Sequence, residues 1–359
     1  MPPSPRTSAS EASLLRPGRA GVLLIVLALA ATLLVPLYFG GVAALRATLH
    51  LSAVGYWGLF TLIFASWVAR TLKLQLLLRR MGVEVGFLHM FEISLATDFG
   101  FLATPAGLGG YAASVYYTRR AGASISAAAA LTAADQTLDL VFFGLALPVA
   151  GFAFFGSALP PKLLGAALTT CAALTALGFG AWLLQRQPRP AAWQKLGSRW
   201  PRLQRALDEF RAQAGTQARL LLGGGPIFLG SAFALTVIQW LTRYGILWLV
   251  LVLLGCPVSF WLLLALQALV LHVAQWSGVP AGGGGAELGL TASLASWVPA
   301  ATLATALLLW RMITLYLALG VGAIAIARLA RRNVSPAAPG TSQQMAMQGS
   351  RAAKAAPLD

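Results

Sequence analysis

Apolar residues along this chain occur in long continuous runs and not in the alternating pattern of a half-buried strand. A run of about 20 apolar residues lets a helix cross a hydrocarbon core of about 30 Å. Such runs begin near Ala20, Leu51, Ser126, Leu163, Pro226 and Ala300. Two further apolar stretches, 87–103 and 258–279, lead directly into glycine-rich loops. The pattern predicts an all-α polytopic membrane protein with about six full spans.

Composition agrees with a membrane protein. Of 359 residues, 58% are hydrophobic and 10% are charged, too few polar side chains to cover a soluble globule of this size. The net charge of +16 would suggest nucleic acid in a soluble protein, but here the basic residues lie between or beyond the apolar runs. Only Arg46 and Lys162 remain for the opposite face. The positive-inside rule then predicts cytoplasmic N- and C-termini, contact with anionic lipid headgroups and no nucleic-acid partner.

The chain divides into a transmembrane domain between two tails without apolar periodicity. We expect disordered cytoplasmic tails at 1–19 and 330–359, and a transmembrane domain over 20–329. Within this domain we expect a first helix at 20–39, repeat A at 51–156, a span at 162–184, a cytoplasmic linker at 185–222 and repeat B at 226–329. The first helix resembles a signal peptide, but its long basic start and the lack of a clear small-residue cleavage site favour an uncleaved helix. The linker is either an amphipathic surface helix or a solvated one.

One pattern occurs twice. Trp67-Val-Ala-Arg70 and Gly82 return as Trp240-Leu-Thr-Arg243 and Gly255, 173 residues later. The loop Pro105-Ala-Gly-Leu-Gly-Gly110 returns as Pro280-Ala-Gly-Gly-Gly-Gly285, 175 residues later. The helix-breaking positions of the two loops are Pro105, Gly107, Gly109, Gly110, Pro280, Gly282, Gly284 and Gly285. In a membrane protein, such a duplication indicates a transporter-like site between the repeats.

The segments beside the glycine-rich loops determine the topology. The chain from 107 to 117 is too short to return across the membrane before Arg119 and Arg120 follow. We therefore predict two re-entrant hairpins, one in each repeat, packed within protein because unpaired peptide groups in lipid are costly. With six full spans, the counterpart helices at 51–80 and 226–254 run in opposite directions. The repeats are then inverted, and the hairpins enter from opposite faces.

Two arginines are candidates for a site deep in the membrane. Arg70 and Arg243 lie about 18 residues into their helices, where an arginine costs roughly 2.5–3.5 kcal/mol on insertion scales. Either each forms an intraprotein salt bridge, or together they line a cationic pocket for a phosphate, which a guanidinium binds through its forked donors. The pocket is the favoured interpretation, and both can hold at once.

Few acidic residues are available to pair with these arginines. Glu287 follows the second glycine-rich loop, where it can satisfy a helix start or pair with Arg311 or Arg243. Asp135 and Asp139 lie one helical turn apart, either as partners of the arginines, which is favoured, or as a proton-coupling pair. For Asp98 and Glu92, a cap or salt bridge and a substrate role both stay open.

Signatures of catalysis are missing from the sequence. The histidines are scattered, no cluster has metal-ligand spacing, and the glycine-rich loops match no nucleotide-binding fingerprint. Cys171 and Cys256 lie in or beside apolar runs, which makes a structural disulfide an unfavoured interpretation. We expect no enzyme activity, no catalytic residues, no metal and no cofactor.

These motifs together resemble the flippase-like membrane family, the transmembrane part of lysylphosphatidylglycerol synthase, which also includes multiple peptide resistance factor and hopanoid-associated proteins. The second half carries the family pattern at Pro280, Gly282, Gly284, Glu287 and Arg311. The first half departs from it: Gly110 and Ala113 stand where the family has Glu and Arg, and Asp135, Gln136 and Asp139 stand where it has Glu, Arg and Asp. The resemblance implies a lipid-handling fold without the aminoacyl-transferase domain.

We therefore expect a lipid translocase of a bacterial inner (plasma) membrane that binds an anionic headgroup in a midplane cavity between the repeats. The expected substrate-binding residues are Arg70, Arg243, Glu287, Arg311, Asp135 and Asp139, and the expected lipid is a phospholipid, polyprenyl phosphate or terpenoid lipid. One alternative is an accessory protein that passes a lipid to a separate lipid-modifying enzyme without moving it across the bilayer. Another is a proton-coupled carrier of a small solute that uses Asp135, Asp139 and Asp98.

Overall fold

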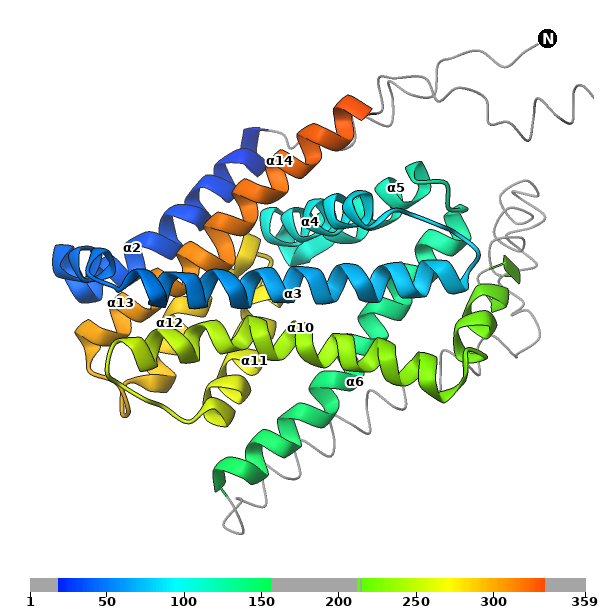
Figure 1. The fold of residues 1–359 in the computed structure, drawn as a ribbon. Coiled ribbons are helices and arrows are strands. Elements are labelled where there is room, and N and C mark those ends of the chain that lie inside the picture. The colour runs from blue at the N-terminus through cyan, green and yellow to red at the C-terminus, as the bar shows by residue number, and fades with distance from the viewer. Residues whose placement is uncertain (1–18, 156–211, 214, 333–359) are drawn as a thin grey trace, which may run out of the picture.

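A computed structural model describes residues 19–155, 212–213 and 215–332, and every regular element in these residues is helical (Figure 1). The α-helices, in chain order, are α2 (Arg19–Leu49), α3 (Ala53–Arg80), α4 (Phe87–Ala103), α5 (Leu108–Arg120), α6 (Ile125–Phe155), α10 (Gly225–Leu253), α11 (Phe260–Trp276), α12 (Gly285–Leu294), α13 (Ala300–Arg311) and α14 (Leu317–Arg332). Short 3₁₀ turns, η1 (Pro105–Gly107) and η3 (Pro280–Gly282), interrupt the helices, and the π-helical η4 (Met312–Tyr316) joins α13 to α14.

Five stretches of the described helices are long and apolar enough to cross a membrane. They are Ile25–Leu49, Ala53–Arg80, Ile125–Ala153, Gly225–Leu253 and Ala300–Arg332. Each agrees with an apolar run of the sequence, but the first helix is longer than the expected 20–39 because it continues past a break at Gly41, where φ is 58°. The predicted span at 162–184, most of the linker and nearly all of both tails lie outside the described residues.

Short helices flank each glycine-rich loop. α4 and α11 have 17 residues each, whereas α5 has 13 and α12 has 10. At 1.5 Å per residue, the two shorter helices span about 20 Å and 15 Å, too little to cross the hydrocarbon core. α5 folds back along α4, so closely that a β-carbon on Gly100 would lie 2.6 Å from the carbonyl of Gly109.

The backbone repeats with the sequence. α3 and α10 both end at a left-handed glycine, Gly82 with φ of 78° and Gly255 with φ of 74°. Each glycine closes the hydrogen-bond pattern of a Schellman motif, which satisfies the last carbonyls of its helix. The two Pro-Ala-Gly turns also match, because Ala106 and Ala281 have φ of 51° and 53°. The duplicated residues therefore form duplicated local structures.

α3 and α10, the helices that carry the duplicated tryptophan and arginine, pack side by side and run antiparallel (Figure 1). Gly55 near the start of α3 faces Leu253 at the end of α10. At the other end, Arg80 donates a hydrogen bond to the carbonyl of Gly223 at 3.1 Å, just before α10 begins. Buried leucine and isoleucine side chains of this pair form part of the largest hydrophobic core.

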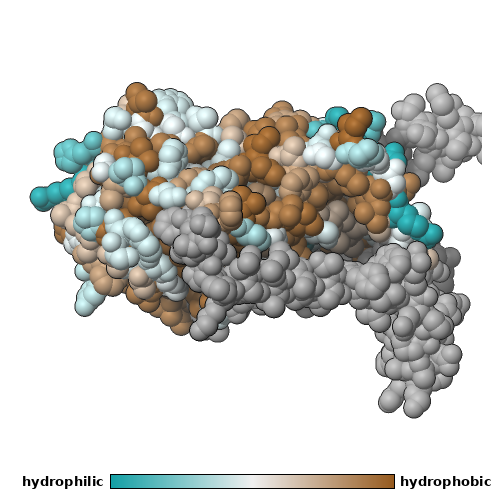
Figure 2. All heavy atoms as spheres, turned by 90° about the horizontal axis from the view of Figure 1, so that it is seen from below, coloured by the Kyte–Doolittle hydropathy of each residue, from teal (hydrophilic) through white to brown (hydrophobic). Residues whose placement is uncertain are grey.

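Contacts between the two halves occur in matching pairs. α4 packs against α14, and its counterpart α11 packs against α6. The turns η1 and η3 contact each other, and each also contacts the opposite short helix, α11 or α4. Figure 2 shows hydrophobic side chains over much of one face of the molecule, with strongly hydrophilic residues gathered at its left and right ends. Such a surface suits a protein surrounded by acyl chains.

Candidate functional site

Six charged side chains meet where α3, α4, α6 and α10 come together. We call this group the charge cluster; its members are Arg70, Lys73, Asp98, Asp135, Asp139 and Arg243. With three cations and three carboxylates, the charge cluster is formally neutral when every member is ionised. Buried charges are tolerated when they are paired, so the pairing explains how apolar helices accommodate them.

Both terminal nitrogens of Arg70 bind carboxylates, whereas its buried Nε has no hydrogen-bond partner within the described residues. Its Nη1 donates to Asp98, and its Nη2 donates to Asp135 at 3.1 Å. The guanidinium carbon also lies 5.6 Å from the centre of the Phe101 ring, within the range of a cation–π contact. All three charged side chains are almost fully buried. Arg70 therefore joins three helices of the first half.

Lys73 lies one turn beyond Arg70 on α3 and is fully buried. Its ammonium group is 2.7 Å from Asp135 and 2.9 Å from Asp139. Asp139 also accepts a hydrogen bond from the indole nitrogen of Trp240 at 2.9 Å. One lysine thus serves two carboxylates, and Asp139 has the weaker ionic compensation because Asp135 is paired with Arg70 as well.

Arg243 links the second half of the chain to the first. Its Nη2 donates to Asp98 at 2.6 Å, so the two duplicated arginines share one carboxylate. The side chain of Arg243 is 21% exposed, whereas that of Arg70 is 6% exposed. The Nε of Arg243, like that of Arg70, is buried and has no hydrogen-bond partner within the described residues. Arg243 therefore keeps donors that a further anion can use.

Glu287 and Arg311 form a second buried pair. The Nε of Arg311 donates to Glu287, its Nη2 is 3.4 Å from the carbonyl oxygen of Ala281, and its guanidinium stacks on Trp310 at 4.5 Å. Glu287 lies in the first turn of α12, where the helix dipole favours a carboxylate. The π-helical turn that begins at Met312 follows Arg311 directly, and such turns occur often at functional sites.

The structure brings four of the six expected substrate-binding residues together, namely Arg70, Arg243, Asp135 and Asp139. Glu287 and Arg311 pair with each other, which is one of the alternatives that the sequence leaves open. Across the described part of the chain, no ion pair links them to the charge cluster.

Three further residues take part in these contacts. Sequence reasoning did not assign Lys73 and Trp240 to the site, and for Asp98 it left a salt bridge and a substrate role open. Lys73 follows Arg70 by three residues and so shares its helix face, a signal that could have identified it. Asp98 bonds both duplicated arginines, so its salt-bridge interpretation is confirmed. The indole of Trp240 binds Asp139 from another helix, and no local sequence signal indicates that contact.

The two glycine-rich turns, η1 and η3, contact each other. Gly107 and Gly282 adopt left-handed φ of 71° and 63°. A β-carbon on Gly107 would lie 2.8 Å from the Nε2 of Gln275 on α11, and one on Gly282 would lie 2.6 Å from Ala274. These positions need glycine both for conformation and for close approach.

One end of the molecule is basic and carries its own ion pairs. Glu92 on α4 lies 3.2 Å from Arg332 at the end of α14, and Arg332 also donates to the ring of His89. Burial, and then the neighbouring Arg332, lower the pKa of His89. These contacts hold the start of α4 against the end of α14.

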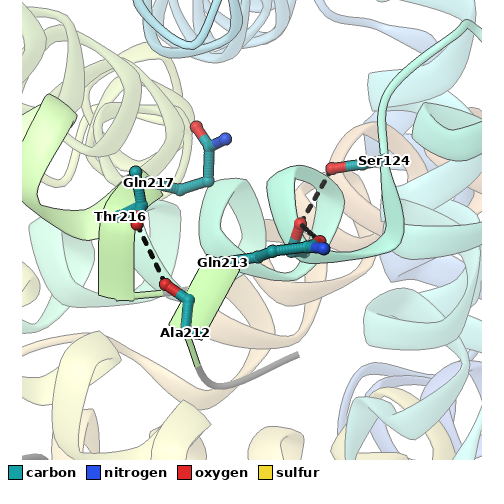
Figure 3. A pocket seen from close by; sticks show the side chains of 6 residues that line it. Ser124, Ala212, Gln213, Thr216 and Gln217 are labelled. Carbon is teal, nitrogen blue, oxygen red and sulfur yellow. Dashed lines mark hydrogen bonds between the residues drawn. The ribbon is translucent and has the colours of Figure 1, made fainter. Parts of the chain in front are cut away.

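A pocket of about 290 Å³ lies beside the start of α6 (Figure 3). It is lined by Ser124, Ser126, Ala212, Gln213, Thr216 and Gln217. Ser126 bonds Ser124 at 2.8 Å and Gln213 at 3.0 Å, and Thr216 bonds a backbone carbonyl. The hydroxyl groups around the pocket thus bond neighbouring groups of the chain. The pocket is separate from the charge cluster, because Asp135 lies nine residues beyond the pocket-lining Ser126 along α6, about 14 Å.

Within the described residues, no group of histidine, cysteine and acidic side chains has the arrangement of a metal site. The comparison with known proteins is more informative. The family described as "Lysylphosphatidylglycerol synthase TM region" matches residues 20–322. A relative described as "UPF0104 membrane protein", from Archaeoglobus fulgidus, is 25% identical over 280 residues, which cover 74% of this chain and 84% of the relative. The match concerns a membrane region and not a catalytic domain, and it spans every described helix except the last turns of α14. This multi-pass membrane protein belongs to the lysylphosphatidylglycerol synthase TM region family.

Proposed function

We propose that the chain is a lipid translocase that binds an anionic lipid headgroup between two inverted repeats in the cytoplasmic (inner) membrane. Three observations support inverted repeats: the duplicated turns, the antiparallel packing of α3 against α10, and the exchanged contacts of α4 and α11 with the opposite halves. α5 and α12 are too short to span, which supports two re-entrant hairpins. In transporters with this architecture, broken helices form the binding site at the repeat interface.

The observation that carries the proposal is the position of Arg243. It bridges the two halves through Asp98, it is partly exposed, and its Nε is free of protein partners within the described residues. A phosphodiester is the anion that suits a guanidinium with spare donors. Arg70 and Arg311 are almost fully buried and position the helices around this site. The two terminal nitrogens of Arg70 bond Asp98 and Asp135, and the Nε and Nη2 of Arg311 bond Glu287 and the carbonyl of Ala281.

The headgroup then occupies a place beside Arg243, and the glycine-rich turns allow the two halves to rock between access states. The termini and basic loops face the cytoplasm, where they contact anionic headgroups. The substrate is a phospholipid, polyprenyl phosphate or terpenoid lipid. The protein acts without a catalytic site, a cofactor or a nucleic-acid partner.

Purified protein in liposomes tests this function. Fluorescent phosphatidylglycerol in the outer leaflet is bleached by a membrane-impermeant reductant, and lipid that has moved inward escapes bleaching. We expect faster exchange than in empty vesicles. Arg243→Gln should reduce the rate about 10- to 100-fold, since a hydrogen bond to a charged group contributes roughly 1.5–3 kcal/mol. Arg119→Gln, an exposed basic residue at the end of α5, serves as the matched control and should leave the rate unchanged.

The proposal fails if exchange equals that of empty vesicles, or if Arg243→Gln and Arg119→Gln behave alike. A second candidate is an accessory protein that binds a lipid and passes it to a separate lipid-modifying enzyme. The internal pairing of Glu287 with Arg311 favours this alternative, because a buried ion pair resists the rearrangement that translocation needs. In that case the purified protein retains phosphatidylglycerol but does not exchange it between leaflets.

A further inference from the structure

We infer that Asp139 takes up one proton when an anionic headgroup binds beside Arg243, so that translocation is coupled to protons. The inference rests on the proposed function and adds the form of energy coupling. Its starting point is the charge count: the charge cluster holds three cations and three carboxylates, all joined by contacts of 3.1 Å or less. The charge cluster therefore has no excess positive charge with which to neutralise a bound anion.

Adding one anion to a balanced group leaves a net negative charge among buried side chains. An uncompensated charge in such surroundings costs several kcal/mol. Protonation of one carboxylate removes that charge without moving any helix. The protein therefore binds a singly charged phosphodiester together with one proton, and it releases both together; no bond other than that between the proton and the carboxylate forms or breaks.

The contacts identify which carboxylate takes the proton. Asp98 is held by two arginines, and Asp135 is held by Arg70 and Lys73. Asp139 has only Lys73, which it shares with Asp135, and a neutral hydrogen bond from Trp240. Asp139 consequently gains least from staying ionised.

The exposure of the side chains also favours Asp139 as the carboxylate that takes the proton. The Asp139 side chain is 14% exposed, whereas those of Asp98 and Asp135 are 4% exposed. A proton therefore reaches Asp139 without passing the other two carboxylates. The charged and titratable groups around it on the packed helices are Lys73 of α3, Tyr111 of α5, Asp135 of α6, and Arg243 and Tyr244 of α10. His272 of α11 lies farther out, against Phe143 one turn beyond Asp139.

Binding in detergent gives the first test. Short-chain phosphatidylglycerol, whose single phosphodiester charge does not titrate near neutral pH, is mixed with the full chain in weakly buffered solution that contains a pH indicator. We expect about one proton taken up per lipid bound, and an affinity that falls about tenfold for each unit rise in pH, as linkage requires. Asp139→Asn should bring the number of protons per bound lipid to about zero. Because the ratio is normalised to bound lipid, a weaker affinity of the variant does not obscure it.

Two matched variants complete the design. Glu92→Gln removes a buried carboxylate outside the charge cluster and should keep one proton per lipid. Asp139→Glu keeps a titratable group and should restore proton uptake even where Asp139→Asn folds poorly. In liposomes, a pH gradient should drive net movement of labelled phosphatidylglycerol toward the alkaline leaflet in the wild type, because the loaded state carries a proton.

The outcomes separate this inference from the proposed function. If the protein exchanges phosphatidylglycerol at a rate and in a direction that do not depend on the pH gradient, and takes up no proton on binding, the proton coupling is wrong. The proposed translocase function then still stands. Proton uptake that persists in Asp139→Asn also overturns it, because the proton then resides elsewhere. Failure to bind phosphatidylglycerol at all overturns both.

Discussion

Replacing Glu287 tests whether the buried charges are held by their partners. Glu287 is fully buried, and Arg311 is 3% exposed. Glu287→Leu therefore leaves the Arg311 guanidinium without a counter-charge and unable to reach water. Removing one member of a buried ion pair typically costs about 3–5 kcal/mol. We expect the free energy of unfolding to fall by that amount, and Arg311→Met to have a similar effect.

The double variant Glu287→Leu/Arg311→Met removes both charges and keeps apolar volume. Because replacing a whole buried pair by apolar side chains is often neutral or stabilising, most of the lost stability should return. Unfolding in mixed micelles with increasing SDS, followed by intrinsic tryptophan fluorescence, measures all four proteins of the cycle. Glu92→Leu is the control, and it should cost about 1 kcal/mol or less, since its partner Arg332 is 50% exposed and can turn to water.

Two results would refute the reasoning. One is a loss below about 1 kcal/mol in either single variant, which would mean that the remaining charge finds another partner or solvent. The other is a double variant as unstable as the sum of the singles, which would mean that the two side chains do not act as a pair. The same double variant also reports on function: restored folding without lipid exchange would give the pair a role beyond stability.

Three further perturbations address the hairpins and the basic end. Gly100→Ala should lower the free energy of unfolding by about 1–3 kcal/mol, because the new β-carbon would lie 2.6 Å from backbone atoms of α5. The control is Gly320→Ala, whose β-carbon would have no atom within 4 Å and which should be neutral in the same SDS titration. Ala106→Gly should raise the melting temperature slightly. A left-handed φ costs a non-glycine residue about 1–2 kcal/mol, and the larger conformational entropy that glycine loses on folding cancels part of the gain. A lower melting temperature would argue against a left-handed φ at this position. Burial and Arg332 lower the pKa of His89, so as the pH falls below the ordinary value of 6.5 the unfolded chain takes up the proton before the folded chain does, and the folded state loses stability. In thermal melts, His89→Gln should reduce this loss of stability below pH 6.5. An unchanged dependence of the melting temperature on pH would contradict the lowered pKa of His89.

Hydrophobic length and helix breakers account for most of what the sequence predicts about the fold. The span at 53–80 and the short helix at 87–103 follow from continuous apolar runs that end at glycine or at a Pro-Ala-Gly turn. The first helix was expected to end at residue 39, but in the structure the helix continues to Leu49, beyond a break at Gly41. Local propensity alone does not decide whether a helix kinks or ends, because packing decides it: Gly40 lies against Ala304 of α13.

The charge cluster was less predictable than the fold. The cost of burying Arg70 and Arg243 predicts that partners exist, and it narrows them to the few acidic residues of the transmembrane region. It does not tell which helices meet. The shared carboxylate of Asp98 depends on α4 packing against α3 where α3 runs antiparallel beside α10, a tertiary arrangement that no local spacing encodes. Glu287 and Arg311 were expected at the same site, yet helix packing places them in a pair of their own.

The lipids that copurify with the protein test the central claim most directly, namely that Arg243 receives an anionic headgroup inside the membrane domain. Native mass spectrometry of wild type, Arg243→Gln and Arg119→Gln, purified from the same membranes, measures the anionic lipid retained per chain. We predict that the wild type and Arg119→Gln retain it, and that Arg243→Gln loses most of it while staying folded. Equal retention by all three proteins, or greater loss in Arg119→Gln, would contradict the account, because the headgroup would then be held by the basic surface instead of the charge cluster.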